Sequence, residues 1–293
     1  MLAECSRSLP RGRFAYIADM SLASRSKSLC LTFDVEEFDL PADVGVNLSR
    51  TLRRDIAREG GERLLELIPL LGPFTCFVTG TFARRHPGLV GRLAAAGCEI
   101  ACHGLDHGDR YGSFSSSELM RRLSRARELL QENSGQEVTG HRGPRFSPAP
   151  EQVLLEAGFS YDSSIHPTWV PGRYNHLLRP LNPQRSRAGL WQVPVTVLPV
   201  TRLPLSWIWF RNYPEALLRL TTRSLARRSA LICVYFHSWE LCDLNSKAGG
   251  LPWPVRRNTG PALTRRLEGW AAALEDRGFA SRCNLDSFIS SQG

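Results

Sequence analysis

Short apolar runs alternate with longer amphipathic stretches from Leu29 onward. The short runs are typical of buried strands, and the longer stretches repeat apolar side chains at helical spacing. This alternation predicts a parallel sheet or barrel with helices outside it. Strands are predicted at Leu29–Phe33, Phe74–Thr79, Glu99–Cys102, Val138–Gly140, Trp191–Val200 and Leu231–Phe236, and helices at Arg54–Leu71, Pro87–Ala96, Ser117–Asn133, Pro150–Ala157, Pro214–Arg228 and Pro261–Arg277.

The domain organisation follows from this pattern and from the length. A chain of 293 residues is normal for a single barrel-like α/β domain. We therefore expect an N-terminal extension at residues 1–28 and one folded domain at residues 29–293. Residues 166–190 are rich in Pro, Gly and Asn and are long for a plain connection, which is typical of a functional loop.

Charge changes this picture only in part. The formal net charge is +9, and because Lys27 and Lys247 are the only lysines, the basicity is almost entirely arginine. Nucleic-acid binding is not expected, because the arginines are scattered along predicted helices and no known nucleic-acid-binding signature occurs. An anionic membrane surface, a phosphorylated substrate and an ordinary solvated surface are the explanations left open.

Cysteine placement indicates buried free thiols rather than a disulfide framework. Cys76 lies inside an apolar strand-like run, and Cys98 and Cys102 alternate with Ile100 as strand residues. Residues 1–28 build no apolar signal-peptide core, and no later run is long enough to span a membrane. We therefore expect a cytoplasmic protein, with peripheral contact at the inner membrane surface as an option.

Polar residues with metal-binding or acid–base chemistry follow four of the predicted strands. They are Asp34, Glu36 and Glu37 after the first strand, His103 and His107 after the third, Arg142 after another, and His237 after the last long one. Catalytic residues of barrel-like folds cluster at the carboxyl ends of strands. Sequence-distant segments are therefore expected to converge on one site.

The histidine pair and the acidic cluster suit a metal centre. His103 and His107 are four residues apart, so a helical turn would place both imidazoles on one face, within reach of one ion. A capping histidine beside a polar core histidine is the alternative. Of the carboxylates, one can bind the ion while another accepts a proton from water. A solvated acidic turn is the alternative for that cluster.

In this order the motifs resemble those of the polysaccharide deacetylase family, the nodulation-deacetylase homology domain of carbohydrate esterase family four. The resemblance covers nearly all of residues 28–289 and implies a distorted (β/α)7-type barrel with outer helices. It implies that His103 and His107 bind the metal and that Asp34 is the catalytic base. Most members have two adjacent aspartates, whereas here Val35 intervenes, so Glu36 is assigned as the third ligand and Glu37 remains the alternative.

The remaining family motifs supply the other catalytic residues. The resemblance implies that Arg142, in Arg142-Gly-Pro, pairs with the base, and that His237 is the general acid that protonates the leaving amine. The fourth motif is not reproduced at its usual spacing. Asp162 is our candidate to orient His237, and Trp169 is our candidate to line the acyl pocket.

Substrate contacts are expected from the long loop and from Trp239, two residues after His237. Arg173, Tyr174 and Asn175 are candidates to bind sugar hydroxyls or a phosphate, and Trp239 is added to this substrate-binding set. The apolar run Leu203–Phe210 precedes the arginine-rich segment Arg219–Arg228, a combination that can seat on a bilayer surface. Packing of this run onto the barrel is the alternative.

The resemblance therefore implies a hydrolase that removes an N-acyl group, acetyl first, from an amino sugar. It requires one divalent ion, for which a carboxylate with two histidines suits zinc and also cobalt, nickel or manganese. The alternatives are a deformylase or deacetylase of an amino sugar carried on a lipid phosphate, and a carbohydrate-binding protein that has lost catalysis.

Overall fold

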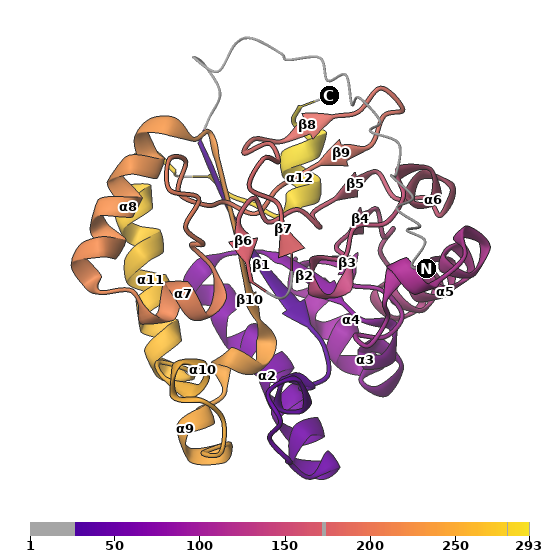
Figure 1. The fold of residues 1–293 in the computed structure, drawn as a ribbon, viewed down its shortest axis with the longest axis horizontal. Coiled ribbons are helices and arrows are strands. Elements are labelled where there is room, and N and C mark those ends of the chain that lie inside the picture. Colours follow the sequence, from indigo (N-terminus) through magenta and orange to yellow (C-terminus); the bar gives the residue numbers. More distant parts are fainter. Residues whose placement is uncertain (1–26, 172–173, 280, 293) are drawn as a thin grey trace, which may run out of the picture.

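A curled, mostly parallel sheet with helices on its outer side forms the fold (Figure 1). The computed structural model describes residues 27–171, 174–279 and 281–292, so almost all of the predicted extension lies outside the described residues. The sheet runs in the order β10-β1-β2-β3-β4-β5-β9-β8, and every neighbouring pair from β10 to β9 is parallel. This arrangement confirms the predicted barrel-like α/β fold.

Two strands, β1 (Ser28–Val35) and β10 (Leu231–His237), are longer than the others. Residues 193–196 continue beyond β9 and bridge the two sides of the sheet, because Val195 N–H donates to the Ile165 carbonyl and Thr196 N–H to the Cys233 carbonyl. The strands are β1 (Ser28–Val35), β2 (Thr75–Val78), β3 (Glu99–Cys102), β4 (Gly140–His141), β5 (Tyr161–Asp162), β8 (Gln184–Arg185), β9 (Trp191–Gln192), β10 (Leu231–His237) and β11 (Ser281–Arg282), with a separate hairpin β6 (Trp169–Val170) and β7 (Tyr174–Asn175).

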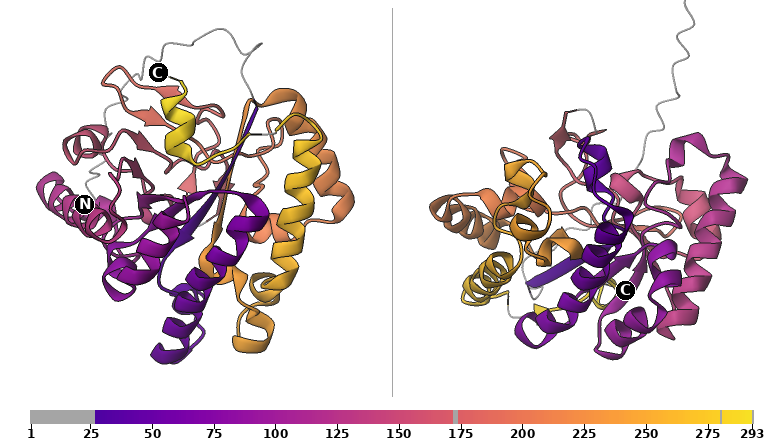
Figure 2. Two further views of the ribbon diagram at one scale, coloured as in Figure 1. Left: turned by 180° about the vertical axis from the view of Figure 1, so that it is seen from behind. Right: turned by 90° about the horizontal axis from the view of Figure 1, so that it is seen from below.

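Helices cover the outside of the sheet, as the views in Figure 2 show. They are α1 (Leu40–Asp43), α2 (Arg50–Leu71), α3 (Gly80–Arg85), α4 (Pro87–Ala95), α5 (Ser116–Ser134), α6 (Glu151–Glu156), α7 (Trp207–Asn212), α8 (Glu215–Arg228), α9 (Leu244–Lys247), α10 (Trp253–Arg256), α11 (Pro261–Glu275) and α12 (Leu285–Ser290), with 3-10 turns at Tyr111–Ser113, Pro144–Phe146 and Ser238–Leu241. In the described residues, no helix combines the length and apolarity that crossing a membrane requires.

The core lies between β1, β10 and the helices that cover them. Both strands are buried along nearly their whole length, because helices cover one face and the barrel interior occupies the other. Phe33 packs edge-on against Phe74, with ring centroids 4.9 Å apart. The close approach of α2 depends on Gly60, where an added Cβ would lie 2.5 Å from the Ser238 carbonyl oxygen. Helix α2 therefore sets the position of the turn that follows His237.

Several elements differ from the sequence-based predictions. Of the predicted strand Trp191–Val200, Trp191–Gln192 alone pairs as a regular strand, because Pro194 and Pro199 lack the amide hydrogen that a ladder needs. The apolar run Leu203–Phe210 contains the start of α7, which was not predicted. The described cysteines form no disulfide, and all of them except Cys283 are buried, as expected for free thiols.

Candidate metal centre and catalytic site

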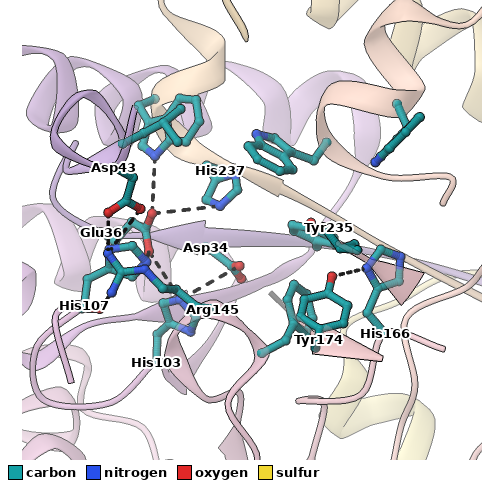
Figure 3. Close-up of a pocket in the computed structure, with 16 residues that line it drawn as sticks. Asp34, Glu36, Asp43, His103, His107, Arg145, His166, Tyr174, Tyr235 and His237 are labelled. Carbon is teal, nitrogen blue, oxygen red and sulfur yellow. Dashed lines mark hydrogen bonds and ion pairs between the residues drawn. The ribbon is translucent and has the colours of Figure 1, made fainter. Parts of the chain in front are cut away.

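Glu36, His103 and His107 converge at the carboxyl ends of β1 and β3. All three side chains are buried, and their potential ligand atoms lie within 4.8 Å of one another. His103 Nε2 is 3.3 Å and His107 Nε2 is 3.0 Å from Glu36 Oε2 (Figure 3). Glu37 forms an ion pair with Arg85 at 2.7 Å instead, so Glu36 is the acid that joins the histidines.

The protonation state of this group fits a cation. His103 Nδ1 lies 2.8 Å from the Arg142 carbonyl oxygen, which can only accept, so Nδ1 carries the hydrogen and Nε2 presents a lone pair. Glu36 Oε2 is buried and has no hydrogen-bond donor among the described residues. Burial raises the pKa of Glu36, but the imidazoles of His107, His103 and His237 lower it to about 2, so the carboxylate is ionised. A carboxylate oxygen without a donor and two imidazole nitrogens within 3.3 Å of it make a donor set that suits a divalent ion.

The two histidines reach Glu36 through a turn rather than a helix. Residues 103–107 are not helical, so the pair does not reach one point by the helical turn that its spacing would also allow. Gly104 has φ of +77°, and an added Cβ would lie 2.9 Å from the Tyr111 hydroxyl. The turn is held from α3, because Gly80 N–H donates to the Gly104 carbonyl. The left-handed glycine redirects the chain so that both imidazoles face one point.

Asp34 lies beside this group and is held by Arg142. Arg142 Nη1 donates to Asp34 Oδ1 at 2.7 Å and to Thr32 Oγ1 at 2.9 Å, and Nη2 donates to Ser163 Oγ at 3.0 Å. The second carboxylate oxygen, Oδ2, lies 3.9 Å from His103 Nε2. Asp34 therefore has one oxygen fixed by the guanidinium and the other facing the metal group, as a general base requires.

His237 lies on another side of the metal group, with Nε2 at 3.9 Å from Glu36 Oε1. Its Nδ1 is 3.2 Å from Glu240 Oε1, which also accepts the His237 N–H at 2.8 Å. Glu240 in turn pairs with the buried guanidinium of Arg211 at 2.5 Å. Burial lowers the pKa of His237, but the hydrogen bond that its Nδ1 donates to Glu240 and the charge of Glu36 raise the pKa above its usual value.

The prediction that Asp162 orients His237 was wrong. Asp162 Oδ1 lies 2.8 Å from His141 Nδ1, and His141 is its register partner on the adjacent strand β4. Side chains that are paired in this way on neighbouring strands point to the same side of the sheet, which directs Asp162 toward His141. Glu240 takes the orienting position instead, three residues after His237.

Replacing Glu240 by glutamine is expected to lower the pKa of His237, because a charge-assisted hydrogen bond becomes a neutral one. His237 would then lose its proton at lower pH than in the wild type. A ring-resonance NMR titration of His237, with and without zinc, measures this shift.

Glu66→Gln is the matched control, because Glu66 is exposed and pairs with Arg63 far from the site. The variant Glu240→Gln leaves the buried Arg211 without its carboxylate, which costs about 3–5 kcal/mol of stability. Spectra are therefore recorded well below the melting temperature. A His237 pKa equal to that of the wild type would show that Glu240 does not act on the imidazole.

The pocket above the metal group is lined by residues of the β6–β7 hairpin, but not by all that were predicted. Val170 and Tyr174 line it, whereas Trp169 is 58% exposed and is not among the lining residues. Trp169 pairs with Asn175 and Val170 with Tyr174, so alternate residues face opposite sides of the hairpin. The predicted role of Trp169 in the acyl pocket was therefore wrong, and Asn175 is on the same outward side.

The remaining candidates for substrate binding are Arg173, Tyr174, Asn175 and Trp239. The Tyr174 hydroxyl is hydrogen-bonded to His166 Nδ1 at 2.8 Å inside the pocket. Arg173 lies outside the described residues. Trp239 stacks on His237 with ring centroids 4.5 Å apart, and its Nε1 is 3.4 Å from Glu36 Oε1. Trp239 therefore supports both the acid and the metal group. A sugar-binding role for Asn175 stays a prediction.

Sequence reasoning missed several residues of this site. Glu240 and Arg211 were not assigned roles, although a glutamate three residues after a candidate acid and an arginine inside an apolar run are both detectable signals. The apolar wall was also missed, because its members come from three separate segments. It consists of Phe146, Trp207, Trp209 and Tyr235.

Comparison with known proteins agrees with this geometry. A family model described as polysaccharide deacetylase matches residues 70–160, which contain His103, His107 and Arg142. A second model, a domain of unknown function (DUF3473), matches residues 163–284, which contain His237 and Glu240. The search of curated proteins found no match.

Solved structures share the fold over most of the chain. A putative polysaccharide deacetylase from Mycobacterium smegmatis is 21% identical with a TM-score of 0.65, covering 96% of this chain and 94% of that one. Puue allantoinase is 18% identical with a TM-score of 0.58, covering 92% of each chain. BA3943 from Bacillus anthracis, a CE4 family pseudoenzyme, is 13% identical with a TM-score of 0.50, covering 89% and 65%.

The fold and the buried Glu-His-His group define a barrel of the deacetylase type with a candidate site for one metal ion. More specifically, residues 70–160 match the polysaccharide deacetylase family. Members of this family are typically hydrolases of carbon–nitrogen amide bonds.

Proposed function

We propose that this protein is a metal-dependent amidase that removes a short N-acyl group, acetyl or formyl, from an amino sugar. The observation that carries the proposal is the buried Glu36-His103-His107 group with Asp34 on one side and His237 on another. A base and an acid placed around one electrophilic centre are what amide hydrolysis needs.

Glu36, His103 and His107 would hold the ion, which when bound polarises the amide carbonyl and makes water a better nucleophile. Asp34 accepts the proton of the attacking water through Oδ2, and Arg142 holds Asp34 in its orientation through Oδ1. His237 donates a proton to the leaving nitrogen, and Glu240 holds its Nδ1 and raises its pKa. Without that proton the amine would be a poor leaving group.

The size of the pocket supports a short acyl group. Its free volume is about 50 Å³, several times the roughly 15 Å³ that one water requires. This space is enough for a nucleophilic water beside an acetyl or formyl group. The walls beside this space are aromatic, including Phe146 and Tyr235, which suits a methyl group.

The function is tested by incubating the zinc- or cobalt-loaded protein with N-acetyl and N-formyl sugars in free, nucleotide-linked, lipid-linked and polymeric form. Mass spectrometry of the released acid identifies the acyl group and the carrier. We expect release from at least one carrier, and loss of this release when the metal is removed by a chelator. A fully loaded protein that releases no acid from any of them would favour a carbohydrate-binding protein without catalysis.

A further inference from the structure

Helices α8 and α11 lie side by side on one flank of the sheet, away from the metal group (Figures 1 and 2). A groove of about 230 Å³ runs between them. Its floor is apolar, with Leu218 and Trp270 almost fully buried, and Glu215 is the one carboxylate among the described lining residues. Five arginines line its walls: Arg219, Arg223, Arg265, Arg266 and Arg277.

We call these five arginines the arginine groove. About half of the other arginines in the described part of the chain have carboxylate partners, as Arg92 has in Glu62 and Arg122 in Asp109. Within the described ranges, no carboxylate oxygen lies within 4.0 Å of any guanidinium of the arginine groove. Neighbouring cations repel one another, so this arrangement favours an external anion.

Exposed apolar side chains adjoin the arginine groove. Leu220 is 63% exposed on α8, one residue after Arg219, and Leu203 and Trp209 are 40% and 41% exposed. Tyr213 connects the segment of Pro204 and Trp209 to the groove. Its hydroxyl donates to the Pro204 carbonyl at 2.9 Å, its ring lies 6.4 Å from that of Trp209, and its carbonyl accepts from Arg266.

The arginine groove and the exposed apolar side chains together indicate the chemistry of the partner that would bind this face. Guanidinium groups match the oxygens of phosphate in paired hydrogen bonds, and exposed leucine and tryptophan partition into the boundary between lipid headgroups and acyl chains. A soluble phosphate ligand would use the cations but not the exposed apolar side chains. We propose that this face docks on an anionic lipid bilayer, with lipid phosphates in the arginine groove.

The test uses the full chain with vesicles of phosphatidylcholine alone or mixed with phosphatidylglycerol, measured by co-sedimentation at low and physiological salt. We expect binding to the mixed vesicles only, and weaker binding at higher salt. The double variant Arg219→Gln/Arg223→Gln should bind about 30-fold more weakly, because each cation near an anionic surface contributes a factor of about five.

The matched control is Arg121→Gln/Arg125→Gln, which removes the same charge from exposed, carboxylate-paired positions on α5 and should bind like the wild type. Leu203→Ser/Leu220→Ser keeps the charge and should weaken binding severalfold. Circular dichroism and bound zinc show that each variant is folded. Equal binding to both vesicle types, or no effect of the groove variant, would overturn the proposal. So would binding of inorganic diphosphate without binding of vesicles, which would indicate a soluble ligand.

Discussion

Replacing His103 by alanine is expected to abolish both metal binding and turnover. His103 supplies one of three ligand atoms, and its Nε2 lone pair is directed at Glu36 by the hydrogen bond from Nδ1 to the Arg142 carbonyl. Loss of a partner outside the ligand shell alone typically costs 10–100-fold in affinity, so loss of a ligand should cost about a thousandfold or more. Calorimetric titration with zinc and elemental analysis of the purified protein measure this loss.

The matched control for this prediction is His86→Ala. His86 is partly exposed and packs against Phe82, outside the metal group. It should keep full zinc stoichiometry and full activity. An alanine variant at position 103 that binds zinc as tightly as the wild type would remove His103 from the ligand set, and with it the proposed centre.

Replacing Asp34 by asparagine is expected to lower kcat by about 10²–10⁴-fold while zinc binding is kept. Asparagine has the size of aspartate and can still accept from Arg142, but it cannot take up a proton from water. The two carboxylates differ in their distance from the imidazole, because Asp34 Oδ2 is 3.9 Å from His103 Nε2 whereas Glu36 Oε2 is 3.3 Å from it. Turnover with the substrate found in the acyl-sugar panel and zinc stoichiometry are measured on the same preparation.

Asp39→Asn is the control for this variant, because Asp39 follows the same strand but pairs with Arg53 away from the pocket. A second control is Asp34→Asn with Arg142→Met, which removes the guanidinium that the first variant leaves without a carboxylate. Loss of zinc from both Asp34 variants would make Asp34 a ligand rather than a base. Unchanged kcat would transfer the role of the base to another residue.

The strand-end residues were the part of the site that could be predicted from sequence. Asp34, His103, Arg142 and His237 all follow short apolar runs, and parallel strands bring such positions to one end of a barrel. The predicted barrel itself follows from the alternation of apolar strands with amphipathic helices. Both depend on patterns that are local in sequence and on a topology with few alternatives.

The errors concern side-chain direction, which local patterns do not determine. Trp169 and Val170 are adjacent, and the pairing of the hairpin decides which of them faces the pocket. Asp162 and Glu240 were both available carboxylates near candidate histidines, and the register of β4 against β5 commits Asp162 to His141. The spacing of His103 and His107 fits a helix as well as a turn, and the positive φ of Gly104 distinguishes them.

The buried position of Arg142 also has a consequence for how the chain folds. Its guanidinium is fully enclosed and bonds to Thr32 and Asp34 on β1 and to Ser163 beyond β5, segments more than a hundred residues apart. An enclosed cation without these partners would cost several kcal/mol, so partly assembled forms keep Arg142 in water. Asp34, the proposed base, is thus oriented only at the step that joins the first strand to the fourth and fifth. A nascent chain therefore fixes the orientation of Asp34 only after the segment up to Ser163 has packed with the first strand.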